Sequence, residues 1–215
     1  MMEVFGFDLG PIIPFILIGF AAQMVDGALG MAFGVITNTL MVGLLGVPPA
    51  LASQRVHLVE CFTTATSGIS HLLHGNIDKG LFFRLLVPGV IGGLVGTYLI
   101  TSIDGDTIKP FVLIYLAGIG VWLLIRGLLY PPRVRQARHV APLGLVGGFL
   151  DAAGGGGWGP VVTSNLLVQG AEPRKVVGTV NSVEFFLTLT ISASFIYHLG
   201  ISHIAGATLG LIIGG

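Results

Sequence analysis

The feature that most constrains this chain is a series of apolar blocks, most of them about as long as a lipid bilayer is thick. The blocks lie at residues 11–45, 51–73, 80–100, 108–129, 140–168, 176–199 and 203–215. A helix needs about 20 apolar residues to cross ~30 Å of hydrocarbon. Only 9% of the residues are charged, whereas soluble domains carry about 25%, so a water-facing surface could not be covered. The pattern predicts an all-α, polytopic transmembrane helical bundle.

The charge balance and the single cysteine argue against several other classes of protein. Ten Lys and Arg balance ten Asp and Glu, and no basic tail indicates a nucleic-acid partner. Cys61 has no companion for a disulfide or a zinc motif. His57 and Glu60 lie three residues apart without a third ligand at convincing spacing, so we predict no metal and no cofactor. No nucleophile elbow is present, so we do not expect an enzyme.

The two sides of a basic linker at residues 131–139 match at a constant offset. The matched pairs are Asp26 and Asp151, Gly30 and Gly155, Gly34 and Gly159, Pro48 and Pro173, and, after a one-residue gap, Val56 and Val180, Val59 and Val183, Glu60 and Glu184, Phe62 and Phe186, Thr64 and Thr188, and His74 and His198. Two glycine-rich apolar blocks could look alike by composition, but the matched acids argue against this. We predict a first repeat at 1–130 and a second at 140–215, an arrangement typical of secondary transporters.

The distribution of Lys and Arg favours repeats of opposite orientation, because these residues concentrate in cytoplasmic loops. If every block crosses once, six of the ten basic residues lie on the side of the linker. If the first and fifth blocks are broken or re-entrant hairpins, eight of the ten basic residues lie on that side. Each half then crosses three times and the repeats are inverted; a long tilted helix is the alternative to each hairpin. The last block stops at Gly215 in mid-pattern, so we expect a second repeat that is truncated.

Glycine-rich interruptions in the first and fifth blocks predict unwound backbone inside the membrane. Four consecutive glycines, Gly154, Gly155, Gly156 and Gly157, would each cost ~1 kcal/mol relative to alanine within a helix. An unwound stretch before a half-helix would direct N–H groups and the positive end of the helix dipole at an anion. Gly30 lies in the matching stretch of the first half. The alternative is that these glycines only let helices pack closely.

Acidic residues inside the apolar blocks are candidates for ion coupling, because a charge at mid-bilayer costs at least ~2.5 kcal/mol. Asp26 and Asp151 lie at the breaks, where we favour a role as caps of free backbone N–H groups over a proton or cation site. Glu60 and Glu184 are candidate proton carriers, and His57, which shares a helix face with Glu60, is a further candidate for proton coupling. A glutamate that only locks helices together is the open alternative.

A second set of polar residues is predicted to contact the substrate. Arg55 could bind an anion through its planar fork, pair with an acid, or extend to the membrane interface. Thr37 and Asn38 could line a polar path, although each could instead bond to its own helix backbone. Asn181 and Glu184 repeat the spacing of His57 and Glu60, which adds Asn181 to the candidates.

The glycine-rich first segment of each half also carries a family resemblance. These segments read GALGMAFGVITNTLMVGLLGVPPALA and GGGGWGPVVTSNLLVQGAEPRKVVGT; a Thr/Ser-rich helix follows each, and the turn HGNIDKG comes before the next helix. With them, the chain from about Gly19 to its end resembles the TauE/SafE family of sulfite exporters and sulfonate permeases. The resemblance implies seven or eight membrane segments in two repeats. It also implies transport of small sulfur-containing anions such as sulfite or organosulfonates.

These observations together predict a multi-pass transporter of the cell membrane that works by alternating access. The substrate is expected between the halves, against the glycine breaks, and a proton or sodium gradient is expected to drive it. The predicted partners are the lipid bilayer, a small anion and the coupling ion. Glycines at residues 89–96 would allow a homo-oligomer. The alternatives are a passive anion channel and an accessory membrane subunit without transport activity.

Overall fold

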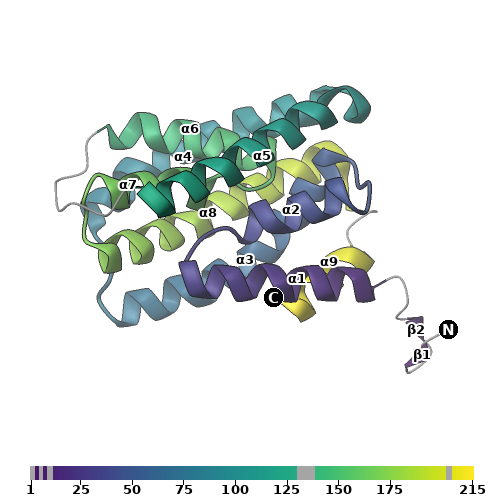
Figure 1. Ribbon diagram of the computed structural model, residues 1–215, viewed down its shortest axis with the longest axis horizontal. Coiled ribbons are helices and arrows are strands. Elements are labelled where there is room, and N and C mark those ends of the chain that lie inside the picture. Colours follow the sequence, from purple (N-terminus) through teal and green to yellow (C-terminus); the bar gives the residue numbers. More distant parts are fainter. Residues whose placement is uncertain (1–2, 5–6, 9–11, 130–138, 202–204) are drawn as a thin grey trace.

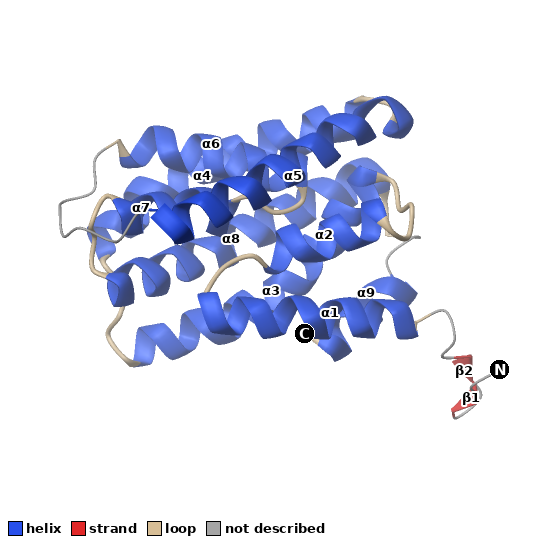
Figure 2. Ribbon diagram, viewed as in Figure 1, coloured by secondary structure: helices blue, strands red, loops and turns tan. Residues whose placement is uncertain are grey.

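The chain folds into a bundle of helices, as predicted (Figure 1). The computed structural model describes residues 3–4, 7–8, 12–129, 139–201 and 205–215. The helices are α1 (Ile13–Leu29), α2 (Phe33–Gly43), α3 (Pro49–Leu73), α4 (Lys79–Ser102), α5 (Gly105–Leu129), α6 (Val140–Gly154), the π-helix η1 (Trp158–Thr163), α7 (Ser164–Val168), α8 (Pro173–Leu199) and α9 (Ala205–Gly214). Within the described residues, the strands are β1 (Glu3–Val4) and β2 (Phe7–Asp8), an antiparallel pair near the N-terminus (Figure 2). The predicted basic linker lies, except for His139, outside the described residues.

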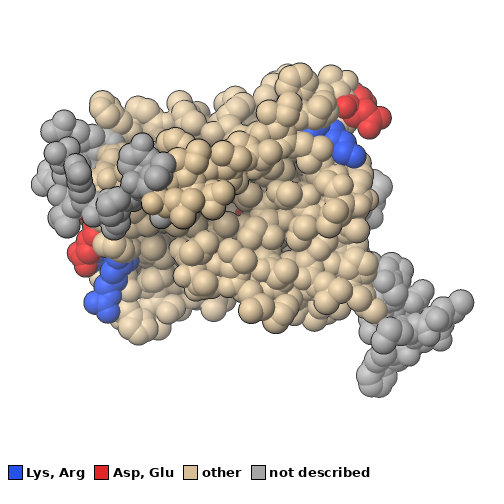
Figure 3. Space-filling model, viewed as in Figure 1, with Lys and Arg blue, Asp and Glu red and all other residues tan. Residues whose placement is uncertain are grey.

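The bundle has the length and the charge distribution of a membrane domain. Among the described helices, α4, α5 and α8 are long and apolar enough to cross a bilayer. Helix α3 has 25 residues, which is also long enough at 1.5 Å per residue, but it buries polar side chains such as His57 and Glu60. Charged side chains gather at the two ends of the long axis, and the face seen in Figure 3 has almost none between them. This is the distribution expected of a bundle whose long axis lies along the membrane normal.

The first and fifth apolar blocks each contain a break. Helix α1 runs inward from the end that carries the N-terminus and α2 returns to that end, whereas α6 and α7 enter and leave at the opposite end (Figure 1). Gly30 ends α1 at φ 66° and Gly155 ends α6 at φ 67°, a left-handed conformation that favours glycine. Their N–H groups donate to the carbonyl oxygens of Asp26 and Asp151. The same local sequence therefore ends a helix in the same way twice.

Helices α3 and α8, which the repeat matches, pack antiparallel through the centre of the bundle. Gln54 Nε2, near the start of α3, donates to the carbonyl oxygen of Gly200, just after α8. Asn181 Nδ2, in the first half of α8, donates to Ser67 Oγ, late in α3, over 2.9 Å. The larger of two apolar cores lies around α8, with Phe195 fully buried in it.

Helix α4 packs closely along α6, and α9 packs in the same manner along α1. A Cβ atom on Gly92 would overlap the carbonyl oxygen of Leu145, and a Cβ atom on Gly148 would overlap that of Gly89. Such close approach of two backbones is what small residues permit in membrane helices. The glycines at residues 89–96 are therefore used within the chain, and a homo-oligomer stays a prediction.

We expect Gly92→Ala to lower the thermal stability of the protein in detergent, because the added methyl group forces α4 and α6 apart. Overpacking of this kind typically costs about 1–3 kcal/mol. Thermal unfolding of the purified variant measures the loss. Gly118→Ala in α5 is the matched control, since no atom lies within 4 Å of the Cβ position there. Equal stability of the two variants would contradict a tight α4–α6 contact.

Candidate functional site

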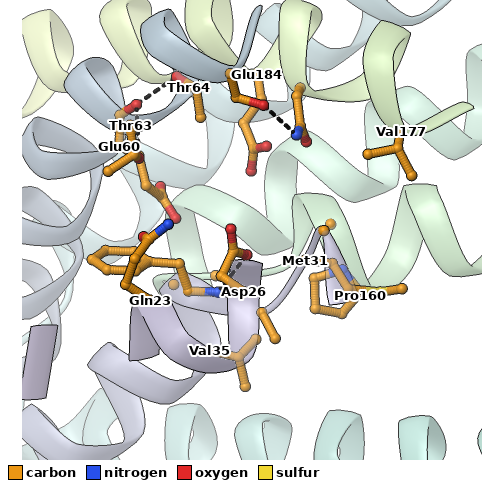
Figure 4. Close-up of a pocket in the computed structure, with 18 of the residues that line it drawn as sticks. Gln23, Asp26, Met31, Val35, Glu60, Thr63, Thr64, Pro160, Val177 and Glu184 are labelled. Atoms are coloured by element: carbon orange, nitrogen blue, oxygen red, sulfur yellow. Dashed lines mark hydrogen bonds between the residues drawn. The ribbon is translucent and has the colours of Figure 1, made fainter. Parts of the chain in front are cut away.

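A cavity of about 250 Å³ lies where both breaks meet α3 and α8 (Figure 4). Its walls come from both predicted repeats. Asp26 and Gly34 contribute from the first break, Glu60 from α3, Gly156 from the second break and Glu184 from α8. The two matched pairs of acids, placed far apart in the sequence, therefore surround one space.

The two breaks touch each other backbone to backbone. A Cβ atom on Gly34 would lie 2.9 Å from the Cα atom of Gly156, and one on Gly159 would lie 2.9 Å from the Cβ atom of Met31. The repeat matches Gly34 with Gly159 and, at the same offset, Met31 with Gly156. Each contact is therefore the repeat equivalent of the other. Reciprocal contacts of this kind are what a two-fold relation between two units produces.

Asp151 accepts four successive backbone N–H groups of the second break. Its carbonyl oxygen accepts from Gly155 and Gly156, and its Oδ1 accepts from Gly157 over 2.8 Å and from Trp158 over 2.9 Å. A carboxylate at the start of a helix is stabilised by these donors and by the helix dipole. The amides predicted to hold an anion are thus satisfied within the chain, and an anion would have to displace Asp151 or bind elsewhere in the cavity.

Asp26 has the equivalent position in the first break. Its carbonyl oxygen accepts from Gly30, and its Oδ1 accepts from the N–H of Phe33, at the start of α2, over 3.1 Å. This geometry agrees with the cap predicted for both aspartates. It does not test whether either group also binds a proton or a cation.

His57 connects α3 of the first half to Asp151 of the second half. Its Nδ1 lies 2.7 Å from the carbonyl oxygen of Ser53 and therefore carries a hydrogen. Its Nε2 lies 3.1 Å from Asp151 Oδ2, and both side chains are buried. This contact is a fixed link between the halves beside the cavity.

Comparison with known proteins places the chain in a family. The family model described as Sulfite exporter TauE/SafE matches residues 15–215. The chain belongs to the TauE/SafE family. The resemblance predicted from the glycine-rich segments is thereby confirmed, and with its apolar helices this TauE/SafE chain is a membrane protein.

Two curated relatives of this TauE/SafE chain are named as transporters. "Probable membrane transporter protein YtnM" of Bacillus subtilis (strain 168) is 43% identical over 197 residues, which cover 88% of this chain and 65% of the relative. A "Probable membrane transporter protein" of Haemophilus influenzae (strain ATCC 51907 / DSM 11121 / KW20 / Rd) is 24% identical over 208 residues, which cover 92% of this chain and 81% of the relative. The chain thus spans less than two thirds of the Bacillus relative. No solved structure matches this chain.

The remaining substrate candidates of this TauE/SafE chain fall into two groups. Gly30, Gly156, Gly157 and Asn181 line the cavity. Gly154 and Gly155 instead lie where Tyr115 and Asn38 pack against the break, and a Cβ atom at either position would overlap those side chains.

Thr37, Asn38 and Arg55 lie outside the cavity lining. Thr37 and Asn38 are buried, and Asn38 Nδ2 donates to the carbonyl oxygen of Gly154 over 2.6 Å, which joins α2 to the second break. The guanidinium carbon of Arg55 lies 5.8 Å from the centre of the Phe15 ring. Contact of these residues with a substrate remains a prediction.

Several polar residues in or beside the cavity were missed by sequence reasoning, among them Gln23 and Tyr115. Gln23 lines the cavity, and its position one turn before Asp26 within an apolar block was the available signal. Tyr115 of α5 donates its hydroxyl hydrogen to the carbonyl oxygen of Gly156 over 3.3 Å; a single tyrosine in an apolar helix gave no signal of this contact.

One group of described residues has the composition of a metal site. His57, Glu60 and Asp151 each offer one ligand atom, and these atoms lie within 4.8 Å of one another. Imidazole with two carboxylates suits several divalent metals. In the described geometry, however, His57 Nε2 and Asp151 Oδ2 already bind each other. The absence of a metal therefore stays a prediction.

Proposed function

We propose that this chain forms the transport path of a secondary transporter that moves a small sulfur-containing anion across the cell membrane by alternating access. The observation that carries the proposal is the central cavity, where two matched helix breaks from the two halves meet. Discontinuous helices that meet near mid-membrane are the usual site of substrate and coupling ion in such transporters. The family's description as sulfite exporters supports the substrate class.

Alternating access would follow from an inverted relation between the repeats at 1–130 and 140–215. Three observations support this relation: the reciprocal contacts of the breaks, the antiparallel packing of α3 and α8, and hairpins that open at opposite ends of the bundle. Two inverted units with slightly different conformations form a cavity that faces one side. When the units exchange conformations, the cavity faces the other side.

The cavity extends from the two breaks toward the end of the bundle where α3 ends and α8 begins. Its lining includes His71, late in α3, and Val177, early in α8. Toward the other end, α3 and α8 are joined by the bond from Gln54 to Gly200, and α3 is joined to the second break through His57. Basic residues lie at the end of the bundle where α3 ends and α8 begins, namely Lys79, Arg174 and Lys175. Because basic residues mark the cytoplasmic side, we assign this conformation, within the proposal, to a cavity that faces the cytoplasm.

Glu60 and Glu184 are the residues that we assign to coupling in this proposal. Both line the cavity and are repeat equivalents. An anion could not share a dry cavity with ionised carboxylates unless protons or cations entered with it, because like charges repel strongly at low dielectric. The driving ion would therefore bind in the same cavity as the anion.

Uptake by the purified chain in proteoliposomes tests the transport function. We expect saturable uptake of sulfite or a short alkanesulfonate that depends on an imposed proton or sodium gradient. Glu60→Gln and Glu184→Gln should reduce this dependence by about tenfold or more, the effect of one buried charged interaction. Flux without saturation and without a coupling ion would favour the channel alternative. The proposal fails if none of these anions moves under any imposed gradient.

A further inference from the structure

We propose that the cavity binds a small cationic group beside the anion, held by Gln23, Glu60 and Glu184. This inference deepens the proposed function and rests on it for the presence of the anion. The cationic group has two chemical sources: a sodium ion that moves with the anion, or an ammonium group on the substrate itself. In both cases a compact positive charge would contact the oxygen acceptors that line the cavity.

The charge of the cavity wall is the first observation. Four acidic residues line the cavity, namely Asp26, Glu60, Asp151 and Glu184, and no described lining residue is a lysine or an arginine. Asp151 is compensated by His57 and by two amide donors. Asp26 accepts one amide at the start of α2. These bonds leave the two glutamates as the acidic side chains of the wall for which the described residues supply no hydrogen-bond donor.

Two buried oxygen atoms without a donor are the second and independent observation. Glu60 is 4% exposed, and its Oε2 has no hydrogen-bond partner among the described residues. The amide oxygen Oε1 of Gln23 is also buried without a donor. Figure 4 shows both side chains extending into the same part of the cavity from α1 and α3. Buried polar atoms are almost always satisfied in folded proteins, so these two acceptors support the proposal of a ligand that carries positive charge or hydrogen-bond donors.

The chemistry of the two atoms determines the kind of ligand. Both are acceptors, and an anion is also an acceptor, so an anion alone cannot satisfy them. A proton on Glu60 would supply one O–H donor for the amide oxygen of Gln23, and this neutral pair is the arrangement expected if neither a sodium ion nor an ammonium group binds. A cation between the two satisfies both at once. Carboxylate and amide oxygens are suitable ligands for hard cations and good acceptors for ammonium groups.

Binding to the purified protein in detergent tests this inference separately from transport. The sodium arm measures retention of radioactive sodium ions. The ammonium arm measures retention of labelled 2-aminoethanesulfonate and its competition by ethanesulfonate, which differs only in lacking the amino group. The test variants are Glu60→Gln, which keeps the shape of the side chain, and Gln23→Met. The matched control is Glu172→Gln, at an exposed position before α8.

We expect the wild-type protein to show either sodium binding or a preference for the amino-bearing sulfonate. The affinity behind that effect should fall by about tenfold or more in both test variants but not in the control. Sodium binding that falls in Glu60→Gln assigns the site to the coupling ion. An amino preference that falls without any sodium effect assigns it to the substrate. If the wild-type protein shows neither sodium binding nor a preference for the amino-bearing sulfonate between mildly acidic and neutral pH, the inference is overturned. Full binding by a folded Glu60→Gln protein would also overturn it. Cation binding without any anion transport would refute the proposed function and not this site.

Discussion

Replacing Gly156 by alanine is expected to abolish anion uptake and to destabilise the protein by about 3 kcal/mol or more. Gly156 has a φ of 145°, a conformation outside the range of L-residues that costs of order 1–3 kcal/mol. A Cβ atom there would also overlap the backbone N of Val35 and the carbonyl carbon of Gly34, and such overpacking adds about 1–3 kcal/mol. Backbone atoms at the contact of two breaks cannot move aside as a flexible side chain can. Thermal unfolding in detergent and uptake in proteoliposomes measure the two effects.

Gly27→Ala is the matched control for this prediction. Gly27 belongs to the first break and lines the same cavity, but no atom lies within 4 Å of its Cβ position. It lies inside α1, where alanine is favoured over glycine by about 1 kcal/mol. We therefore expect wild-type stability or slightly more. If Gly27→Ala and Gly156→Ala were equally damaged, close contact between the breaks would not be the cause.

Much of the fold could be predicted because membrane-embedded helices follow a few strong rules. Apolar blocks must be helical, since backbone groups in lipid have no water to bind. Glycine runs and rare acids inside such blocks therefore indicate a departure from regular helix. The breaks were expected around Gly30 and at Gly154–Gly157, and the helices do end at Gly30 and Gly155. The repeat also matched the four acids in pairs, and the structure places all four in the lining of one cavity.

The details of the site could not be predicted, because they depend on packing between segments far apart in the sequence. Asp151 was expected as a cap, but its bond to His57 depends on how α3 lies against the second break. Asn38 was expected on a substrate path, yet its amide group binds the carbonyl oxygen of Gly154. Arg55 was a candidate for contact with an anion, for pairing with an acid or for extending to the interface; its guanidinium lies over Phe15, and contact with an anion stays a prediction. In each case the polar group had several acceptable partners, and only the tertiary arrangement selected one.

Removing the side chain of Asp151 is expected to be more damaging than neutralising it. Asp151→Ala leaves the N–H groups of Gly157 and Trp158 without their acceptor and leaves His57 without its buried partner. Breaking a buried pair by removing one partner typically costs about 3–5 kcal/mol. Asp151→Asn keeps an oxygen for the two N–H groups, and its NH₂ group can donate to Nε2 of a neutral His57. We therefore expect a loss of only about 1 kcal/mol for Asp151→Asn.

The same pair of variants separates the two roles that the sequence left open for Asp151. If the residue is only a cap, folded Asp151→Asn protein should transport with the gradient dependence of the wild type, because the break keeps its shape. If the contact between Asp151 and His57 takes part in proton coupling, the variant should fold but lose that dependence, since an asparagine cannot release a proton. Thermal unfolding measures the first property and uptake against an imposed proton gradient measures the second. Equal instability of Asp151→Asn and Asp151→Ala would contradict the cap, because an amide oxygen in the same position would then have failed to replace the carboxylate.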